Sequence, residues 1–524
     1  MKTLIVERNR YFDSVFLMRI SSELGKLDGI AQAVVAMATP INLENLIKSG
    51  FELGGGTAPL QPADLIIAID AETDEAMTSA RSRLEKLLAG GGADESGVSA
   101  VRPSSLDEAL TTDPRANLVL ISVPGIHAAR EARQALRRGL HVMLFSDNVT
   151  VEDEIELKNE AIERGLLMMG PDCGTAILNG AALGFANVCR SGRIGIVGAS
   201  GTGIQEISSL IHQWGGGISQ AIGTGGRDLS EAVDGRMTRF GIEALGEDPN
   251  TDVIVVVSKT PGSAVAERVI EALASTEKPA VVHFIGGQAE KLSDELETTA
   301  TLADAALAAV AKSGIDTKEA NRPADTLTSL PVPTTVSTLG ETVPNDSACG
   351  RVVGLYCGGT LCQEAWNILH RAGLDVRSNV AGDPTKKIHP EAHETGHVVW
   401  DLGDDAFTVG KPHPMIEPGL RDERVAQTGD DPTIGIVLAD CVIGYGAHEN
   451  PAGSLAEAAT RAARAARQAG RRPAAILASV TGTDQDPQNL HRQRKILEDA
   501  GVIVAPSNAA AAHAAVDLMK GGAS

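Results

Sequence analysis

A glycine-rich turn at residues 198–203 is the clearest candidate for a binding function in this sequence. It follows an apolar run and precedes a stretch with helical periodicity, which predicts a strand that passes into a helix. Backbone N–H groups of such a turn lie at the positive end of the helix dipole, where phosphate and carboxylate groups bind. Ser200 and Thr202 could add hydroxyl donors, while Gly201 and Gly203 allow a ligand to approach closely. The alternative is that a tight turn of this kind needs glycine for structural reasons alone.

Two further turns have related chemistry. The turn at 357–361 repeats the Gly-Thr pair after a second apolar run, and the turn at 170–174 reads Gly-Pro-Asp-Cys-Gly. Both could present backbone donors to an anion. The candidate anion-binding residues of these two turns are Gly358, Gly359, Thr360, Pro171, Asp172 and Cys173.

The first two glycine-threonine turns belong to an internal repeat. RIGIVGASGTGIQE at 193–206 and RVVGLYCGGTLCQE at 351–364 carry their Gly-Thr and Gln-Glu pairs at identical offsets. Downstream, DPNTDVIVVVSKTPG is similar to DPTIGIVLADCVIG, and KPAVVHFIGG is similar to RPAAILASVTG. Three matches in the same order predict two homologous α/β domains, packed about a pseudo-twofold axis.

Three charged side chains are candidates for a role in catalysis. His413 and Lys411 lie in the segment 401–419, which we expect to be a long loop, and loops at strand ends often carry function. Lys259 follows an apolar strand pattern and could hold an anion. Structural hydrogen bonding is the alternative role for His413 and Lys411.

No metal site is expected from the sequence. His389, His393 and His397 are spaced by four residues, but Pro390 lies inside the segment and interrupts a helix, so a polar loop is the simpler interpretation. The six cysteines form no C-x-x-C pair. Cys173 has no histidine at a fixed spacing to activate it as a nucleophile.

Composition excludes several classes of function. The net charge is −22 and no basic run is present, which argues against binding to nucleic-acid phosphates. No apolar window approaches the length of a membrane span, and the first residues lack a signal-peptide pattern, so we expect a cytoplasmic protein. A P-loop is absent, and the glycines of the 198–203 turn do not have the G-x-G-x-x-G spacing of dinucleotide-binding proteins.

Alternating strand and helix patterns predict an α/β fold with parallel sheets. Near the N-terminus we expect strands at 11–19 and 29–40, followed by a strand that runs into a helix at 63–90. A Gly/Ser-rich break and a Pro-rich stretch suggest domain boundaries. The expected parts are a small N-terminal α/β unit (1–97), a Rossmann-like domain (98–190), a first flavodoxin-like domain (191–316), a linker unable to order itself (317–349) and a second flavodoxin-like domain (350–524).

Residues 117–287 resemble the α subunit of succinyl-CoA synthetase. The resemblance is carried, in order, by VPG, GPDCG, GRIGIVGASGTGIQE, AIGTGGRDL, DPNTDVIVVVSK and KPAVVHFIGG. The part after Gly350 resembles the C-terminal domain of that enzyme's β subunit, and the whole, with DLGDDAFTVGKPHPMI, resembles the FdrA family of acyl-CoA synthetase-like proteins. This implies a partial, Rossmann-like CoA-binding-type domain followed by two flavodoxin-like domains.

The departures from the ligase concern its phosphoryl relay. The ligase has a phosphorylated histidine in a Gly-His-Ala-Gly turn, whereas the corresponding GGQAEKLSDELETTA contains no histidine. Ser258 and Lys259 follow the strand after which the ligase has a glutamate, and His283 lies within a predicted strand. The ligase's first glycine-rich loop, which approaches CoA, has no counterpart. A phosphohistidine is therefore not expected, and no cofactor is certain; the family implies CoA, but the missing loop argues against it.

The resemblance to FdrA implies an enzyme subunit for oxamate carbamoyl transfer, in which carbamoyl phosphate and oxamate interconvert with oxalurate and phosphate. Small anionic substrates and other protein subunits are the implied partners. Two alternatives stay open. The chain could be a subunit of a succinate-CoA-type ligase that uses a partner's ATP-grasp domain, or a non-catalytic scaffold that binds an anion or CoA.

Overall fold

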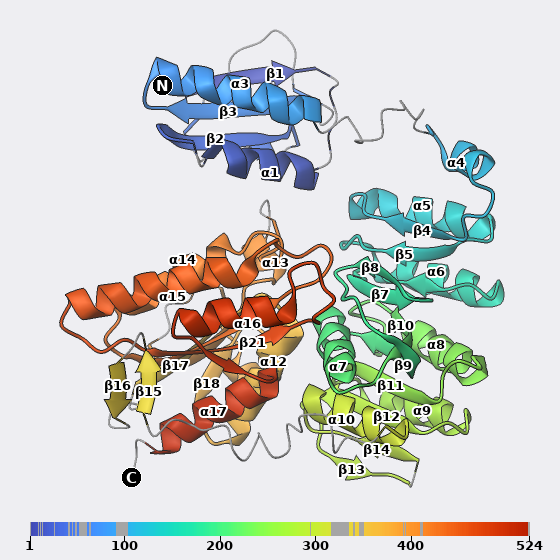
Figure 1. Cartoon of the computed structure of the whole chain (residues 1–524). Helices are drawn as coiled ribbons and strands as arrows, with labels where there is room; N and C mark the ends of the chain where they lie inside the picture. Colours follow the sequence, from blue (N-terminus) through green and yellow to red (C-terminus); the bar gives the residue numbers. More distant parts are fainter. Residues whose placement is uncertain are drawn as a thin grey trace. The chain divides into compact units, whose positions relative to one another are not determined.

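The structure of the chain is a computed structural model (Figure 1). The residues that it describes are 2–8, 10, 12, 14–25, 27–39, 42–43, 46–47, 50–51, 60–61, 64–90, 103–293, 295–315, 335–338, 341–344, 350–390, 392, 395–408 and 412–521. Among these residues no helix is long and apolar enough to cross a membrane.

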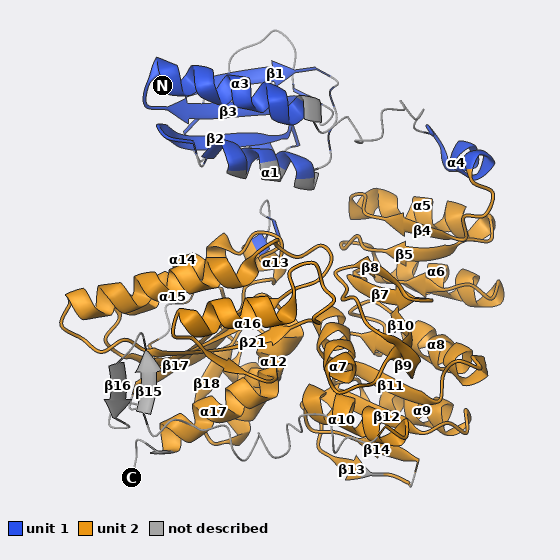
Figure 2. Cartoon of the chain, viewed as in Figure 1, with its two compact units in different colours: residues 1–112, 408–412 blue, residues 113–407, 413–524 orange. Residues whose placement is uncertain are grey.

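The chain divides into two compact units, which Figure 2 shows in blue and orange. One comprises residues 1–112 and 408–412, and the other comprises 113–407 and 413–524. Both are built from alternating strands and helices, and the two main sheets are largely parallel. The predicted α/β class is therefore confirmed.

The first unit is an antiparallel sheet with strand order β1-β3-β2 and helices packed on it. The prediction of a strand at 11–19 was wrong, because this segment runs into helix α1. Leu17, Ile20 and Leu24 recur at helical spacing and are buried together, so they form the apolar face of that helix. The elements of this unit are β1 (Lys2–Glu7), α1 (Ser14–Gly25), β2 (Ile30–Met37), β3 (Leu65–Ala71), α3 (Asp74–Gly90) and α4 (Leu106–Thr112).

The second unit begins with a three-stranded parallel sheet in the order β4-β5-β6. Helices α5 and α6 pack against each other and contact its strands. The elements are β4 (Leu118–Ile121), α5 (Gly125–Arg137), β5 (His141–Leu144), α6 (Val151–Glu163) and β6 (Met168–Met169).

An eight-stranded sheet follows, in the order β13-β14-β12-β11-β9-β10-β7-β8. Its centre, from β14 to β10, is parallel, and antiparallel strands complete the edges. Strand β11 has the continuous apolar run of a strand covered on both faces. The elements are β7 (Thr175–Leu178), β8 (Ala181–Gly184), β9 (Ser191–Ala199), α7 (Gly201–Gln213), β10 (Ile218–Gly223), α8 (Arg236–Glu247), β11 (Val253–Lys259), α9 (Ser263–Ala274), β12 (Ala280–Ile285), β13 (Glu290–Lys291), β14 (Leu296–Thr298) and α10 (Leu302–Lys312).

The last sheet has six parallel strands in the order β18-β19-β17-β20-β21-β22. Before it, the predicted linker 317–349 contains an antiparallel pair, β15 (Thr335–Thr338) and β16 (Glu341–Pro344), where β-branched residues favour extended backbone. The elements of the sheet and its helices are β17 (Arg351–Tyr356), α12 (Gly359–Arg371), β18 (Val376–Ser378), β19 (His397–Asp401), α13 (Asp405–Thr408), α14 (Gly419–Gln427), β20 (Ile434–Val442), α15 (Pro451–Gln468), β21 (Ala475–Thr481), α16 (Leu490–Asp499), β22 (Ile503–Ala505) and α17 (Asn508–Gly521), with short 3₁₀ turns at 384–386 and 428–430.

The two larger sheets share the topology that the internal repeat predicts. Strands β9, β11 and β12 are consecutive neighbours in one sheet, and the matching β17, β20 and β21 are consecutive neighbours in the other. The copies differ on the opposite side, where β10 pairs directly with β9 but β19 separates β18 from β17. This inserted strand brings a further loop, which begins after Asp401, to the carboxyl edge of the six-stranded sheet.

The glutamates of the two repeated Gln-Glu pairs form hydrogen bonds between the two halves of the repeat, which contain the eight-stranded and the six-stranded sheets. Each glutamate accepts from the other half. Glu206 of α7 accepts a hydrogen bond from the backbone amide of Asn508, at the start of α17. Glu364 of α12 accepts one from the amide of Leu302, at the start of α10, at 2.7 Å. The Asn508 side chain also donates to Glu364, and α7, α10, α12 and α17 share one apolar core. Each half therefore caps a helix of the other.

We expect the thermal stability of the chain to fall as pH rises from about 5 to 8, because burial raises the pKa of the Glu364 carboxyl to about 7. The folded state keeps this proton at a pH where the unfolded chain has lost it, so stability is greatest below the unfolded pKa and is lost as pH passes the folded pKa. Glu364→Gln should flatten this dependence in melting temperatures measured from pH 5 to 8.5. An unchanged slope in the variant would contradict the assignment.

Candidate functional site

The two glycine-threonine turns meet at the joint between the two larger sheets. The side-chain oxygens of Ser200 and Thr360 lie 2.5 Å apart and form a buried hydrogen bond. Gly358 packs against the Thr202 side chain, since a Cβ atom built on this glycine would lie 2.9 Å from Thr202 Cγ2. Helices α7 and α12 contact each other, as Figure 1 shows near the centre of the second unit. Their N-termini therefore converge on one place.

Neither of these helices has a side-chain cap at its N-terminus. Ser200 is the N-cap residue of α7, but its hydroxyl bonds Thr360 and not a helix amide. Gly358 is the N-cap residue of α12 and has no side chain to offer. Whichever hydroxyl of the Ser200–Thr360 pair donates, the other hydroxyl keeps its hydrogen for another acceptor. The junction thus offers amide and hydroxyl donors to an anion.

The second turn is shaped by a buried acid that the sequence did not single out. Asp440 of β20 accepts hydrogen bonds from the backbone amides of Cys357 and Gly358, at 2.8 and 2.7 Å. The fully buried Arg421 donates to the Asp440 backbone carbonyl. Because its amide is engaged by Asp440, Gly358 does not supply the anion donor that we predicted. The amides of Gly359 and Thr360, inside the first turn of α12, are the candidates that remain.

Lys259 supplies positive charge beside this junction. It is the last residue of β11, and its side chain is exposed. Among the described residues it forms no hydrogen bond or ion pair, but its charge lowers the pKa of both Asp172 and Asp401. This ammonium group acts on two carboxylates and ends the strand next to β9, after which α7 begins, so it can attract an anionic ligand.

Asp401 is a second carboxylate beside the start of α12. It ends β19, so the predicted loop 401–419 begins one residue later than expected. Its Oδ1 accepts the amide of Gly403 at 2.9 Å, and a Cβ atom on Gly359 would lie 2.4 Å from its Oδ2. The side chain is 8% exposed, and this burial raises the pKa of the carboxyl to about 7, against the opposing effects of the Gly403 amide and Lys259. Asn379 holds its backbone with two hydrogen bonds of 2.9 Å.

His413 lies on the same side of the site as Asp401. A Cβ atom on Gly403 would be 2.6 Å from His413 Nε2 and 3.2 Å from Asp401 Oδ1, so both groups face this glycine. Nδ1 accepts the amide of Met415, and burial lowers the pKa of the imidazole to about 4. His413 is thus a neutral ring that carries its hydrogen on Nε2 at pH 7. It is suited to donate a hydrogen bond and not to act as a base. Lys411 lies outside the described residues.

The turn at 170–174 does not have the donors that we predicted for an anion site. The amide of Asp172 donates to the carbonyl of Ser146, and the amide of Cys173 donates to the carbonyl of Leu144. Pro171 has no N–H group. Burial raises the pKa of the Cys173 thiol to about 12, which keeps it protonated.

The Asp172 side chain instead brings negative charge to the site. It is exposed, but neighbouring protein displaces part of its water and raises its pKa to about 6. Asp147 and Asp405 act in the same direction through their charges. This turn therefore contributes a carboxylate to the surroundings of Lys259, and not an anion-binding nest.

A buried ion cluster fixes the loop after β10. Lys158 Nζ lies 2.7 Å from oxygens of both Glu154 and Asp228, and it donates to the Thr224 carbonyl at 2.9 Å. All three charged side chains are fully buried. Arg227 extends from this loop, pairs with Glu154 and adds positive charge near Asp172. The cluster ties α6 to the GTGGRD segment that begins at the end of β10.

His283, the histidine of β12, is not exposed to a phosphoryl donor. His283 is 1% exposed within β12, and burial lowers the pKa of its ring to about 4. Its Nδ1 faces the backbone carbonyl of Thr299 at 3.1 Å. In the described ranges no group of three His, Cys, Asp or Glu side chains is arranged to hold a metal ion.

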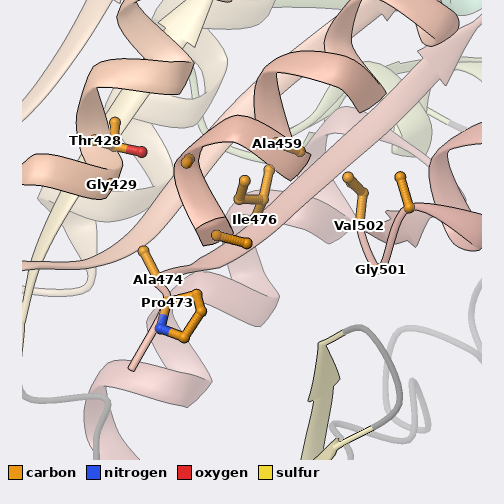
Figure 3. A pocket seen from close by; sticks show the side chains of 11 residues that line it. Thr428, Gly429, Ala459, Pro473, Ala474, Ile476, Gly501 and Val502 are labelled. Atoms are coloured by element: carbon orange, nitrogen blue, oxygen red, sulfur yellow. The ribbon is translucent and has the colours of Figure 1, made fainter. Parts of the chain in front are cut away.

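A cavity elsewhere in the second unit is not a candidate substrate site. Figure 3 shows residues that line it, which come from α15, β21 and the loop before β22. The volume of this cavity is about 20 Å³. Apolar side chains and glycines line most of it, so it has neither the size nor the polar groups that a small anion needs.

The two helices beside the β4-β5-β6 sheet do not offer free N-termini to the pyrophosphate of coenzyme A. Helix α6 is already capped by Thr150, and its first turn carries Glu152, Asp153 and Glu154, which repel a pyrophosphate. At the start of α5, Gly125 packs against the backbone carbonyl oxygens of Asp147 and Asn148. Neither helix N-terminus is therefore arranged to accept the anionic part of CoA.

Three family models match parts of the chain. The CoA-ligase model matches residues 355–518, and the CoA binding domain matches residues 190–286. The model described as "AllF, heavy metal-associated domain" matches residues 1–103. This last segment contains neither cysteine nor histidine, so its residues do not fit a soft heavy-metal ion.

Several known proteins are similar in sequence. Uncharacterized protein YahF of Escherichia coli (strain K12) is 44% identical over 509 residues, which cover 96% of each chain. The succinate–CoA ligase [ADP-forming] subunit alpha-2 of Trichomonas vaginalis is 32% identical over 34% of this chain and 57% of its own. The corresponding alpha subunit of Aquifex aeolicus is 29% identical over 33% and 57%. By its similarity to YahF over almost the whole length, together with its CoA-ligase and CoA-binding domains, the chain belongs to the YahF family within the acyl-CoA synthetase superfamily.

Proposed function

We propose that the chain is an FdrA-like subunit of an enzyme that transfers a carbamoyl group between phosphate and oxamate. The observation that carries this proposal is the junction of two uncapped helix N-termini, where Ser200 and Thr360 are hydrogen-bonded. Such a junction suits the phosphate group of carbamoyl phosphate, whose charge grows as the bond to the carbamoyl carbon breaks. The CoA-ligase fold supports the broader class of acyl transfer.

The geometry supports direct transfer without a phosphorylated enzyme. The amides at the starts of α7 and α12 would bind the phosphate, and the neutral His413 would donate its Nε2–H to the carbamoyl oxygen. Lys259 would bind the carboxylate of oxamate. Its positive charge would offset the repulsion between that carboxylate and the nearby acidic side chains. His283 is too deeply buried to take up the phosphoryl group. Partner subunits would complete the assembly, as the resemblance to FdrA implies.

The test is phosphate release from carbamoyl phosphate by the full chain, purified with its co-expressed partner proteins, against a panel of acceptors. We expect release that depends on oxamate and yields oxalurate, detected by mass spectrometry. Release that is independent of every acceptor, or no release at all, would contradict the proposed function.

Lys259→Met should raise the KM for the carboxylate acceptor by about 10- to 100-fold, because one charge-assisted hydrogen bond contributes about 1.5–3 kcal/mol. The variant keeps the length of the side chain but loses its charge. Lys495→Met, which breaks an exposed ion pair with Asp499, is the matched control and should leave kinetics unchanged. Equal KM values for the two variants would exclude Lys259 from the acceptor site.

The second candidate is a succinate-CoA-type ligase subunit, which the 32% identity to a succinate–CoA ligase alpha subunit favours. This reaction would place a phosphoryl group on the chain or its partner. Incubating the complex with γ-labelled ATP distinguishes the candidates, since label retained on a histidine of this chain would support the ligase. Oxamate-dependent release of phosphate without any labelled intermediate would support carbamoyl transfer.

A further inference from the structure

Hydrogen bonds fix both the backbone and one carboxylate oxygen of Asp401. The Asn379 side chain donates to the Asp401 carbonyl and accepts from its amide at the end of β19, and the Gly403 amide donates to Oδ1. Its second oxygen, Oδ2, has no hydrogen-bond partner in the described part of the chain and faces Gly359, in the first turn of α12. One oxygen is therefore anchored and the other is directed toward the proposed phosphate position.

The groups around Asp401 come from several elements. Lys259 approaches from β11 and favours the charged form, while Asp404 of the following loop and Asp440 of β20 disfavour it. The neutral His413 faces Gly403 together with Asp401. This mixture allows the carboxyl to gain and lose a proton near neutral pH, as an acid–base group must.

The proposed reaction needs such a group. When the oxamate nitrogen attacks the carbamoyl carbon, the new C–N bond forms and the C–O bond to phosphate breaks, with its electron pair going to the phosphate oxygen. The nitrogen must then lose one proton, and the phosphate must gain one to leave as hydrogen phosphate. A single carboxylate between the two positions can move this proton, and no other reactant is required.

We infer that Asp401 is a catalytic residue that takes the proton from the attacking nitrogen and delivers it to the departing phosphate. This inference rests on the proposed function. Its position beside Gly359 places it within reach of both groups. Asn379 is then a positioning residue that sets the direction of the carboxylate.

The experiment compares the wild-type complex with Asp401→Asn, using carbamoyl phosphate and oxamate from pH 5.5 to 9. We expect kcat/KM of the wild type to rise with pH to a plateau, with an apparent pKa near 7, because the base must be ionised. Asp401→Asn should lower kcat by about 100-fold and remove this rise. Asp405→Asn removes the same charge from a neighbouring exposed residue and should keep both the rise and at least a third of the activity.

Folding is checked separately by thermal unfolding at pH 8. Asp401→Asn should be at least as stable as the wild type there, because it removes a buried carboxylate that is costly to ionise. A stable Asp401→Asn complex that retains the wild-type pH profile would overturn the inference while leaving carbamoyl transfer intact. A wild-type complex without oxamate-dependent turnover would instead overturn the proposed function, and the inference with it.

Discussion

Gly359→Ala is expected to lower the turnover of carbamoyl phosphate by about 100-fold, since a displacement of about 1 Å among reacting groups costs this much. The added Cβ atom would lie 2.4 Å from Oδ2 of Asp401, which real atoms do not tolerate. Asp401 cannot move easily, because Asn379 and the Gly403 amide hold it. The carboxylate or the start of α12 must therefore shift. Steady-state kinetics with the purified complex measure the effect.

The internal repeat supplies a matched control. Gly201 occupies the equivalent position in the first turn, but a Cβ atom there would lie 3.3 Å from Thr175 Oγ1, which a small adjustment can accommodate. Gly201→Ala should therefore keep at least a third of the wild-type activity. Equal losses in the two variants would mean that any side chain at a helix N-terminus is harmful and that Asp401 has no special part. Unchanged activity in Gly359→Ala would remove the junction from the chemistry.

Lys158→Met is expected to have the largest effect on stability. The substitution removes the cation from a fully buried cluster and leaves the carboxylates of Glu154 and Asp228 without their shared partner. Breaking a buried pair in this way costs about 3–5 kcal/mol. Differential scanning calorimetry should show a melting temperature lower by about 10 °C for the second unit.

A variant that removes all three charges tests the cause. Lys158→Met combined with Glu154→Gln and Asp228→Asn should recover much of the lost stability, because no buried charge then lacks a partner. If the triple variant is as unstable as Lys158→Met, loss of packing and not of charge pairing is responsible. Wild-type stability in Lys158→Met would contradict the role assigned to the cluster.

The sequence was most informative about the turns and the strands that precede them. The repeat predicted that β9 and β17 occupy equivalent positions in their sheets, and that β11 and β20 do so too. This prediction was possible because apolar runs and glycine-rich turns are local features of the sequence. The strand predicted at 11–19 failed because a short apolar run does not distinguish a strand from one face of a helix.

Local sequence patterns could not predict the contacts between the two halves that contain the larger sheets. The pairing of Ser200 with Thr360 joins residues 160 positions apart, and Asp401 reaches Gly359 only because β19 is inserted beside β17. A single acid in the apolar run of β20 was a visible signal for Asp440, but it does not show which amides that acid accepts. The engaged amides at 172 and 173 likewise depend on β5 and the residues after it.

The unequal hydroxyl pair at the joint has a consequence for how a ligand is oriented. Ser200 precedes the Gly-Thr pair of its own turn, whereas the hydroxyl that it meets belongs to the Gly-Thr pair of the other. The side chains beside the two turns also differ, because Asp401 lies against Gly359 whereas Gly201 meets the Thr175 hydroxyl. In the proposed site, the two ends would therefore be chemically distinct, so that an elongated anion would be accepted in one direction and its reversed pose disfavoured.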